Sequence, residues 1–481
     1  MSEGIQYAGE FSIGKCELIT SSGLHVNLMD SVLSITLYES LKKPMLTGSI
    51  HIQDSFSLPS IGPLIGQEYL SLKLLTPSIE DDDKVLDFTE NVFHIYKIGG
   101  RQASGEGVQI HTLNFISSEA LKNERTRISK TLTGSQDEIV KEMLGAVNCK
   151  KNMYIEPSST SRKYISPNLN PFRVIDMCKF QSTTKHNGSP TYLFYENLNG
   201  FHYRSIESLY AQTPKWKYYQ SPPGAAQETK NTPLHNIKKE LESVIDYSIV
   251  PNNDTLANTI TGMLNSKLLV HDIFNKRYTS HTYNMLDANK DEKHINAYHN
   301  KGDFPIYSKT PVEANKKISD FTTKVFLKPT SIKNTTTNSN AMYTSSTGTY
   351  PFQGHDPQNW YQRRLSQMMQ LETGLCVNVE TLGTTSVTVG DIVDLSLPVK
   401  AAVESPEFAD GIDKLYRGKF LVQNIRHDFE IGVNSKSHTT ILTLVKDSVE
   451  TEFEAPEDNT EPKPASDGII ETEFYLEGGV A

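Results

Sequence analysis

The residues that come closest to a metal site are Asp287, Asn289 and Asp291, which have the one-three-five spacing of a calcium-binding EF-hand loop. The pattern fails at its sixth position, where Glu292 stands in place of the turn glycine, and at its twelfth, where Tyr298 replaces the bidentate glutamate. We therefore expect a solvated loop here. The sequence predicts neither a metal site nor a cofactor.

Three histidines have neighbours that resemble catalytic or metal-binding pairs. His294 and His299 are five residues apart, so on a helix they would not share a face as a chelating i, i+4 pair does. We expect both at the surface. His271 and Asp272 are adjacent on a predicted strand, where successive side chains point to opposite faces, so we expect a structural role for His271.

Motifs for nucleophilic or phosphate chemistry do not occur in the sequence. It contains no GxxxxGKS/T, GxGxxG, GxSxG or HExxH string. Cys16, Cys149, Cys178 and Cys376 have no CxxC spacing, which favours buried free thiols in a reducing compartment over a zinc site or a disulfide framework. We expect no catalytic residues, and a structural or interaction protein is favoured over an enzyme.

Length, hydropathy and charge exclude further classes of protein. The 481 residues suffice for about three domains, and they include neither an apolar run of ~18 residues nor a signal peptide, so we expect no membrane insertion and no Sec export. Of the net charge of −10, Thr451–Ala481 contributes −8, with nine acidic residues against Lys463, which leaves −2 for the rest. A nearly neutral body disfavours sequence-specific nucleic-acid binding, which needs clustered Lys and Arg.

Short amphipathic strands dominate the first part of the chain. In LSITLY, Leu33, Ile35 and Leu37 alternate with polar residues, and the period of two recurs in TGSIHIQ, YLSLKLL, NVFHIYKI and VQIHTLNF. Turn signals separate these strings. The pattern predicts an antiparallel barrel or sandwich.

The pattern changes to helices after residue 117. Ser135 and Glu138 have the spacing of a capping box before an amphipathic helix, and Asn170 with Pro171 predicts the start of a second helix. Asn199-Gly200 predicts a hairpin turn between two aromatic-rich strands. This region is expected to be an α/β module.

Further strands and one helix follow. The Thr, Ser and Asn content of residues 331–355 predicts a long mobile surface loop. Asp356 and Pro357 predict the start of a helix that ends at Gly374.

Strand patterns on both sides of the helical region suggest a duplicated β domain, although no sequence repeat supports it. A true duplication requires the same strand order in both copies. The predicted domains are 1–117 as a first tube-like β-barrel, 118–235 and 286–357 as the α/β wedge module, 236–285 and 358–448 as a second tube-like β-barrel, and 449–481 as an acidic flexible tail.

Several long segments occur in an order that is itself informative. They include VLSITLYESLKKPMLTGSIHIQ, RTRISKTLTGSQDEIVKEMLG, SPNLNPFRVIDMCKF, YLFYENLNGFHYRSIESL, LNSKLLVHDIFNKRYTSHTYNML and NWYQRRLSQMMQLETGLCVNVETLG. In these strings and in their order the chain resembles the baseplate hub protein of T-even-type contractile-tailed phages, many of them cyanophages. The resemblance covers residues 15–447.

The resemblance implies an α+β, mainly β fold with two tube-like antiparallel β-barrels and an inserted α/β wedge module, assembled as a homotrimeric ring. Two similar barrels in each of three subunits make a pseudo-sixfold ring, which adapts the hexameric tail tube to the trimeric central spike. DNA only passes through the lumen. In this family any lysozyme belongs to the neighbouring spike protein, and no catalytic residues match here.

The resemblance also implies a location in the virion, at the tail baseplate, after assembly in the bacterial host cytoplasm. The implied partners are other copies of the chain, the central spike protein, and tail tube or tube-initiator proteins. The alternative is the trimeric hub of a bacterial contractile-injection or type VI secretion system, which is usually fused to its spike. The short tail without spike repeats favours the phage hub.

The acidic tail has two parts. EAPEDNTEPKPASDG contains three prolines and many charges, which predicts an extended linker. IIETEFYLEGGV then gathers five apolar residues, which predicts a partner-binding segment aimed at the spike, with a disordered terminus as the alternative: Ile469, Ile470, Phe474, Tyr475 and Leu476.

Overall fold

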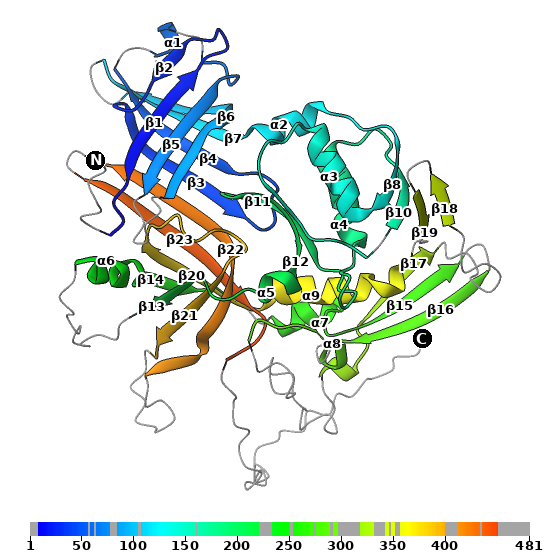
Figure 1. The fold of residues 1–481 in the computed structure, drawn as a ribbon. Coiled ribbons are helices and arrows are strands. Elements are labelled where there is room, and N and C mark those ends of the chain that lie inside the picture. The colour runs from blue at the N-terminus through cyan, green and yellow to red at the C-terminus, as the bar shows by residue number, and fades with distance from the viewer. Residues whose placement is uncertain are drawn as a thin grey trace, which may run out of the picture. The chain divides into compact units, whose positions relative to one another are not determined.

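The computed structural model describes residues 8–55, 58–61, 64–76, 84–103, 107–159, 161–220, 233–250, 254–272, 276–288, 292–296, 318–330, 342–345, 348–351, 356–399, 411–432 and 435–450. Contacts divide the chain into Met1–Thr451 and Glu452–Ala481, and the described residues all belong to the first unit. This unit is mainly β. Its described part contains one sheet of thirteen strands and four smaller sheets (Figure 1).

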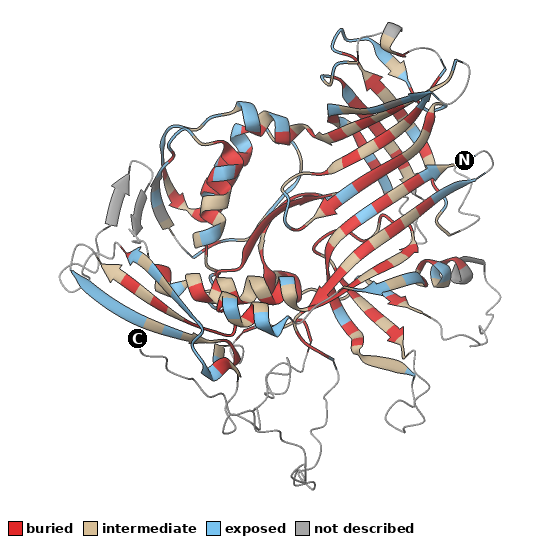
Figure 2. Ribbon diagram, turned by 180° about the vertical axis from the view of Figure 1, so that it is seen from behind, coloured by how far each residue is buried: buried red, intermediate tan, exposed pale blue. Residues whose placement is uncertain are grey.

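Seven strands form the first half of the large sheet, which we call lobe 1. Their order is β3-β4-β7-β6-β5-β1-β2, and all neighbours are antiparallel. The bounds are β1 (Ser12–Ile19), β2 (His25–Asn27), β3 (Val32–Ser40), β4 (Thr47–Asp54), β5 (Tyr69–Thr76), β6 (Lys84–Ala103) and β7 (Gln109–Ser117), with the short α1 (Leu58–Ile61) between β4 and β5. The predicted period of two is confirmed, because Ile50 and Ile52 on β4 and Leu70, Leu72 and Leu74 on β5 are buried. Figure 2 shows this alternation as stripes along the strands.

Six strands form the second half, lobe 2, in the order β14-β20-β23-β22-β21-β13. Neighbours are antiparallel except β13 and β21, which are parallel. The bounds are β13 (Trp216–Tyr219), β14 (Val244–Ile249), β20 (Leu375–Leu382), β21 (Ile392–Pro398), β22 (Ile412–Ile431) and β23 (Lys436–Lys446), with α6 (Pro233–Leu241) before β14.

The two lobes repeat one strand order. Along the chain and across the sheet, β1, β3, β4, β5, β6 and β7 correspond to β13, β14, β20, β21, β22 and β23. The equivalent strands β6 and β22 are also the same length, 20 residues. The lobes differ in β2, which has no counterpart among the described strands of lobe 2, and in the parallel β13–β21 pair. The expected duplication is thus confirmed at the level of strand order, whereas closure of each lobe into a barrel stays a prediction.

The long strand β22 joins the lobes because two strands, one from each lobe, pair one after the other along the same edge of it. Its first half pairs with β21 up to Leu421, and Asn424–Glu430 then pairs with β3 of lobe 1, while β23 lies along the opposite edge. Phe429 is buried in the core of lobe 1. At this joint the lobes form one continuous antiparallel sheet (Figure 1).

The expected α/β module lies between the two lobes in sequence. Its elements are α2 (Ser118–Arg125), β8 (Thr131–Ser135), α3 (Gln136–Ala146), β9 (Met153–Ile155), β10 (Ser161–Ile165), α4 (Pro171–Gln181), β11 (Tyr192–Asn197), β12 (Gly200–Ser205) and α5 (Ile206–Tyr210). The predicted capping box of Ser135 and Glu138 is present at α3. The apolar face of α3 packs against α4 and the β11–β12 hairpin in a core of its own.

Two local predictions in this module need correction. Asn170 precedes α4 but makes no capping bond, because its side chain turns to Glu124, and Asn123 Oδ1 accepts the N–H of Phe172 at 2.7 Å instead. The hairpin turn lies one residue earlier than expected, since Gly200 already pairs with Asn197 as the first residue of β12. Gly200 has φ of 137°, and a Cβ there would meet the Asn152 carbonyl oxygen at 2.3 Å.

The strands of residues 236–285, assigned above to the second barrel, divide between two sheets. β14 joins lobe 2, whereas β15 (Asn265–Asp272) pairs with β16 (Arg277–Asn284) and with β17 (Lys324–Thr330) in a separate sheet. Both edges of β15 are therefore occupied within this small sheet. Next to it lie α7 (Thr255–Thr261), α8 (Met285–Ala288) and the 3-10 helix η2 (Ile318–Asp320). The later hairpin of β18 (Met342–Ser345) and β19 (Gly348–Pro351) contacts β10 of the module.

That hairpin corrects part of the expected loop at 331–355, whose other residues lie outside the described ones. The helix after it also starts later than predicted. Asp356 and Pro357 open only the 3-10 helix η3 (Pro357–Asn359), because Trp360 leaves helical geometry with φ of −138°, and α9 runs from Tyr361 to Thr373. The predicted end at Gly374 is confirmed.

Candidate assembly site at the junction of the lobes and the module

A buried ion cluster fastens the α/β module to lobe 1. Lys151 Nζ lies 2.8 Å from Glu119 Oε2 and 2.6 Å from Glu196 Oε1, and none of the three side chains is more than 8 % exposed. The second oxygen of Glu196 accepts the backbone N–H of Leu46, just before β4, at 3.0 Å. Lys151 therefore pairs with two carboxylates, and one of these also accepts a backbone N–H from lobe 1.

The pKa values in this cluster follow from burial and from Lys151. Burial raises the pKa of Glu196. Burial opposes ionisation of Glu119 too, but Lys151, together with a backbone hydrogen bond and Lys122, outweighs burial and lowers the pKa of that carboxyl. Burial alone would lower the pKa of Lys151, yet Glu196 and Glu119 together raise it. The charges are stable only as a set.

A second buried chain of polar groups lies at the joint between β3 and β22. His427 Nε2 is 3.1 Å from Glu39 Oε1, and His427 Nδ1 is 3.1 Å from His438 Nε2. Glu39 Oε2 also accepts the N–H of Leu198 in the β11–β12 turn at 3.2 Å. The pKa of His438 lies well below its ordinary value because burial disfavours the imidazolium and because His427 is adjacent.

This arrangement has the connectivity of a proton relay, but its side chains are completely buried. A substrate cannot reach them in this fold. This polar network instead connects β3, β22, β23 and the β11–β12 hairpin of the module at the joint between the lobes.

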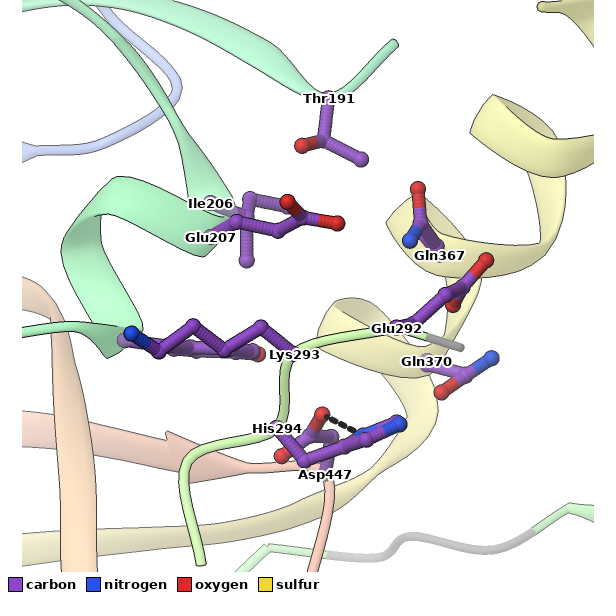
Figure 3. Close-up of a pocket in the computed structure, with 10 residues that line it drawn as sticks. Thr191, Ile206, Glu207, Glu292, Lys293, His294, Gln367, Gln370 and Asp447 are labelled. Carbon is purple, nitrogen blue, oxygen red and sulfur yellow. Dashed lines mark hydrogen bonds and ion pairs between the residues drawn. The ribbon is translucent and has the colours of Figure 1, made fainter. Parts of the chain in front are cut away.

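A small pocket opens where α5, the segment 292–296, α9 and the end of β23 converge (Figure 3). The water-accessible volume is about 20 Å³, which holds about one water molecule. Its lining is largely polar and comes from Thr191, Ile206, Glu207, Tyr210, Glu292, Lys293, His294, Gln367, Gln370 and Asp447.

Ion pairs hold the walls of this pocket together. His294 Nδ1 lies 2.7 Å from Asp447 Oδ2, and Arg363 of α9 reaches Glu292 at 3.0 Å and Glu207 at 3.4 Å. Burial would raise the pKa of Asp447, but His294 and the hydrogen bonds from Ile295 and Ser448 together outweigh burial and lower that pKa. These ion pairs therefore connect α9 and lobe 2 to the module. The pocket between them has room for a water molecule and not for a substrate.

Helix α9 extends this junction to the small β15–β17 sheet. Arg364 is buried and donates to the carbonyl oxygens of Pro190 at 2.5 Å and Tyr192 at 3.1 Å in the module. Gln362 donates to the Ser266 carbonyl of β15 at 2.9 Å. One helix thus fixes the position of two sheets.

The structure confirms one of the predictions made for histidine and acidic residues and contradicts another. The surface position expected for His294 is wrong, because its side chain is 2 % exposed and paired with Asp447, from a segment 153 residues away. Asp287 lies on α8, while Asn289, Asp291 and His299 lie outside the described residues. His271 stacks on Tyr278 across the β15–β16 pair, with ring centroids 4.3 Å apart, as a structural histidine should.

The cysteines are free, and three of the four are buried as expected, with Cys149 partly exposed. Burial raises the pKa of Cys16 to about 12 and that of Cys149 to about 11. Such thiols are poor nucleophiles at neutral pH.

Within the described ranges, no group of three or more His, Cys, Asp or Glu residues is arranged to hold a metal ion. No helix of the described part is long and apolar enough to cross a membrane. The predicted partner-binding residues Ile469, Ile470, Phe474, Tyr475 and Leu476 lie outside the described residues, so their role stays a prediction.

Sequence reasoning did not single out the junction residues Lys151, Glu196, Glu39 and His427. The available signal was a lone carboxylate within an apolar strand, as in SITLYES for Glu39 and YLFYEN for Glu196. A charged residue in such a position needs a buried partner. The sequence does not say which cation supplies it.

No family model and no curated protein matches the sequence. Solved structures do resemble the chain. A tail protein from Neisseria meningitidis has a TM-score of 0.47 at 8 % identity and covers 91 % of this chain and 97 % of its own. The 43 kDa tail protein of prophage MuSo2 from Shewanella oneidensis has a TM-score of 0.47 at 6 % identity, with 90 % and 98 % covered. An Escherichia coli component of the type VI secretion system, described as structurally similar to bacteriophage tail proteins, has a TM-score of 0.37 at 9 % identity, with 93 % and 79 % covered.

Two of these neighbours are tail proteins and the third is a secretion-system component. Their TM-scores are all below 0.5.

Proposed function

We propose that the chain is the structural hub of a contractile phage tail baseplate, with three copies forming a ring around the tail axis. The repeated strand order of lobes 1 and 2 carries this proposal. Three chains with two equivalent lobes each present six similar lobes to a hexameric tail tube, while the threefold axis matches a trimeric spike.

In this assembly each lobe is one tube-like barrel and the α/β module is a wedge fixed to both. The buried networks of Lys151 and of His427 support that geometry, since they hold the module against the joint between the lobes. The lumen lets DNA pass without sequence-specific binding, and the near-neutral charge of residues 1–450 suits that role, because a basic lumen would retain the polyanion.

The proposed hub has no catalytic activity of its own. Its place is the virion, at the tail baseplate, after assembly in the host cytoplasm with spike and tube proteins as partners. The C-terminal segment with Ile469, Ile470, Phe474, Tyr475 and Leu476 acts as a tethered contact for the spike, because a short apolar segment on a charged linker raises the local concentration of its partner.

The mass of the purified chain in solution tests the trimer. Light scattering should give three times the chain mass of 53.9 kDa. A stable monomer at assembly concentrations, even with spike protein added, would contradict the proposal.

A further inference from the structure

We infer that copies of this chain join head to tail by antiparallel strand pairing, in which the outer edge of β14 in one copy pairs with the second half of β6 in the next. The pairing direction comes from this fold alone. Only the number of copies in the closed ring rests on the proposed function.

The junction inside the chain provides the template. There the second half of β22, in lobe 2, pairs with β3 of lobe 1. In the duplicated strand order, β22 corresponds to β6 and β3 corresponds to β14. The equivalent junction would therefore pair β6 with β14, and within one chain these two strands are not neighbours.

The second half of β6 has the free edge that this junction requires. β5 accompanies β6 only as far as His94, and the Ile95 N–H still donates to Glu68 at 2.8 Å. From Tyr96 to Ala103 no described strand lies along that edge, although β7 continues on the other side. β22 has the same division of its edge between β21 and β3.

The outer edge of β14 is also open. A single bridge joins Ser243, just before the strand, to Tyr219, and beyond it no strand in the described part of the chain pairs with this edge. Ile249 is opposite the fully buried Val377 of β20, so its side chain lies on the core side of the sheet. It is nevertheless 50 % exposed, and Ile245 is 51 % exposed. A neighbouring strand would complete this core.

Charge favours a head-to-tail contact over a contact between identical edges. Exposed Asp246 lies on β14, and exposed Lys97 lies on the free half of β6, beside Tyr96, which is 49 % exposed. A β14–β14 contact would place two Asp246 carboxylates in one interface, and a β6–β6 contact would place two Lys97 ammonium groups in one interface. Pairing β14 with β6 brings opposite charges together. A heterologous contact of this kind closes into a ring when its rotation permits.

Substitution at the β14 edge tests the interface. The full-length variant Ile245→Lys/Ile249→Lys should raise the dissociation constant for self-association at least about tenfold, since it places charges where the apolar edge would be buried. The matched control is Leu256→Lys/Ile260→Lys on α7, where the side chains are 71 % and 60 % exposed. The control should associate as the unmodified chain does. Circular dichroism of both variants confirms that the fold is retained.

Cross-linking tests the direction of the contact. Ser248→Cys and Tyr96→Cys are prepared as separate full-length variants and treated with a short bifunctional thiol reagent, with the unmodified chain as background. Covalent dimers should form only when the two variants are mixed, and a chain with both substitutions should give products up to a closed trimer.

The outcomes separate this inference from the proposed function. Self-association that the β14 variant leaves unchanged, or dimers from one cysteine variant alone, would overturn the interface while leaving the hub intact. Wild-type chain that never associates would overturn both. Closure at a number other than three, through the β14–β6 contact, would support the interface and contradict the trimer.

Discussion

Replacing Lys151 with methionine should lower the free energy of unfolding by about 3–5 kcal/mol, because it removes the buried cation that both buried carboxylates contact. The reason lies in the geometry, in which Glu119 and Glu196 both contact Lys151 Nζ and have side chains at most 2 % exposed. Denaturant unfolding followed by circular dichroism measures the loss.

Lys122→Met is the matched control for this experiment. Lys122 Nζ lies 3.6 Å from the same Glu119, but its side chain is 27 % exposed, so its loss should cost less than about 1 kcal/mol. Adding Glu119→Gln and Glu196→Gln to the Lys151 variant should recover part of the stability, since the buried charges are then removed. A Lys151 variant as stable as the control would show that the cluster does not fasten the module.

Acid should destabilise the fold already between pH 6.5 and 4, and His202 should account for up to about 3 kcal/mol of this loss. Burial, with Arg204 nearby, lowers the pKa of His202 to about 4. The ring lies between Tyr154 and Tyr195, with centroids 4.6 and 4.9 Å away, and Nε2 lies 2.9 Å from Asn197 Oδ1.

The sign follows from proton binding. As the pH falls below the ordinary histidine pKa, the unfolded chain binds a proton that the folded chain accepts only near pH 4. Proton binding therefore stabilises the unfolded state relative to the folded state. The stability contribution is therefore complete above pH 6.5 and is lost towards pH 4. His438, whose pKa is also lowered, acts in the same direction.

Unfolding curves of His202→Gln at several pH values check this prediction. The variant keeps a donor for Asn197 and should have a smaller dependence of unfolding free energy on pH over this range. His186→Gln, at an exposed position, should retain the wild-type dependence. An unchanged slope in the His202 variant would contradict the assignment.

The sequence predicted the parts of this fold that depend on local chemistry. The capping box at Ser135, the apolar face of α3 and the alternation in β4 and β5 follow from side-chain spacing alone. The duplication was suggested by the amphipathic strand patterns on both sides of the helical region, whereas the strand order that confirms it comes from the structure alone.

Pairing between segments that are far apart in the sequence could not be predicted from side-chain patterns. β15 and β16 have the same strand pattern as the lobes, and only the parallel partner β17, more than 40 residues further along, assigns them to another sheet. His294 likewise had no signal of burial, since Asp447 is 153 residues away. The candidate junction consists almost entirely of contacts between residues that are far apart in the sequence. For this reason the strand patterns were predicted, but the residues that connect the strands and the module were not.

Electron microscopy of the intact tail can locate the chain and count its copies. We expect a ring of three copies on the tail axis, between the tube and the spike, with six similar lobes around the channel and β14 of each copy beside β6 of the next. A chain located away from the axis, or a ring in which the two lobes of each copy do not occupy equivalent positions around the channel, would contradict this expectation.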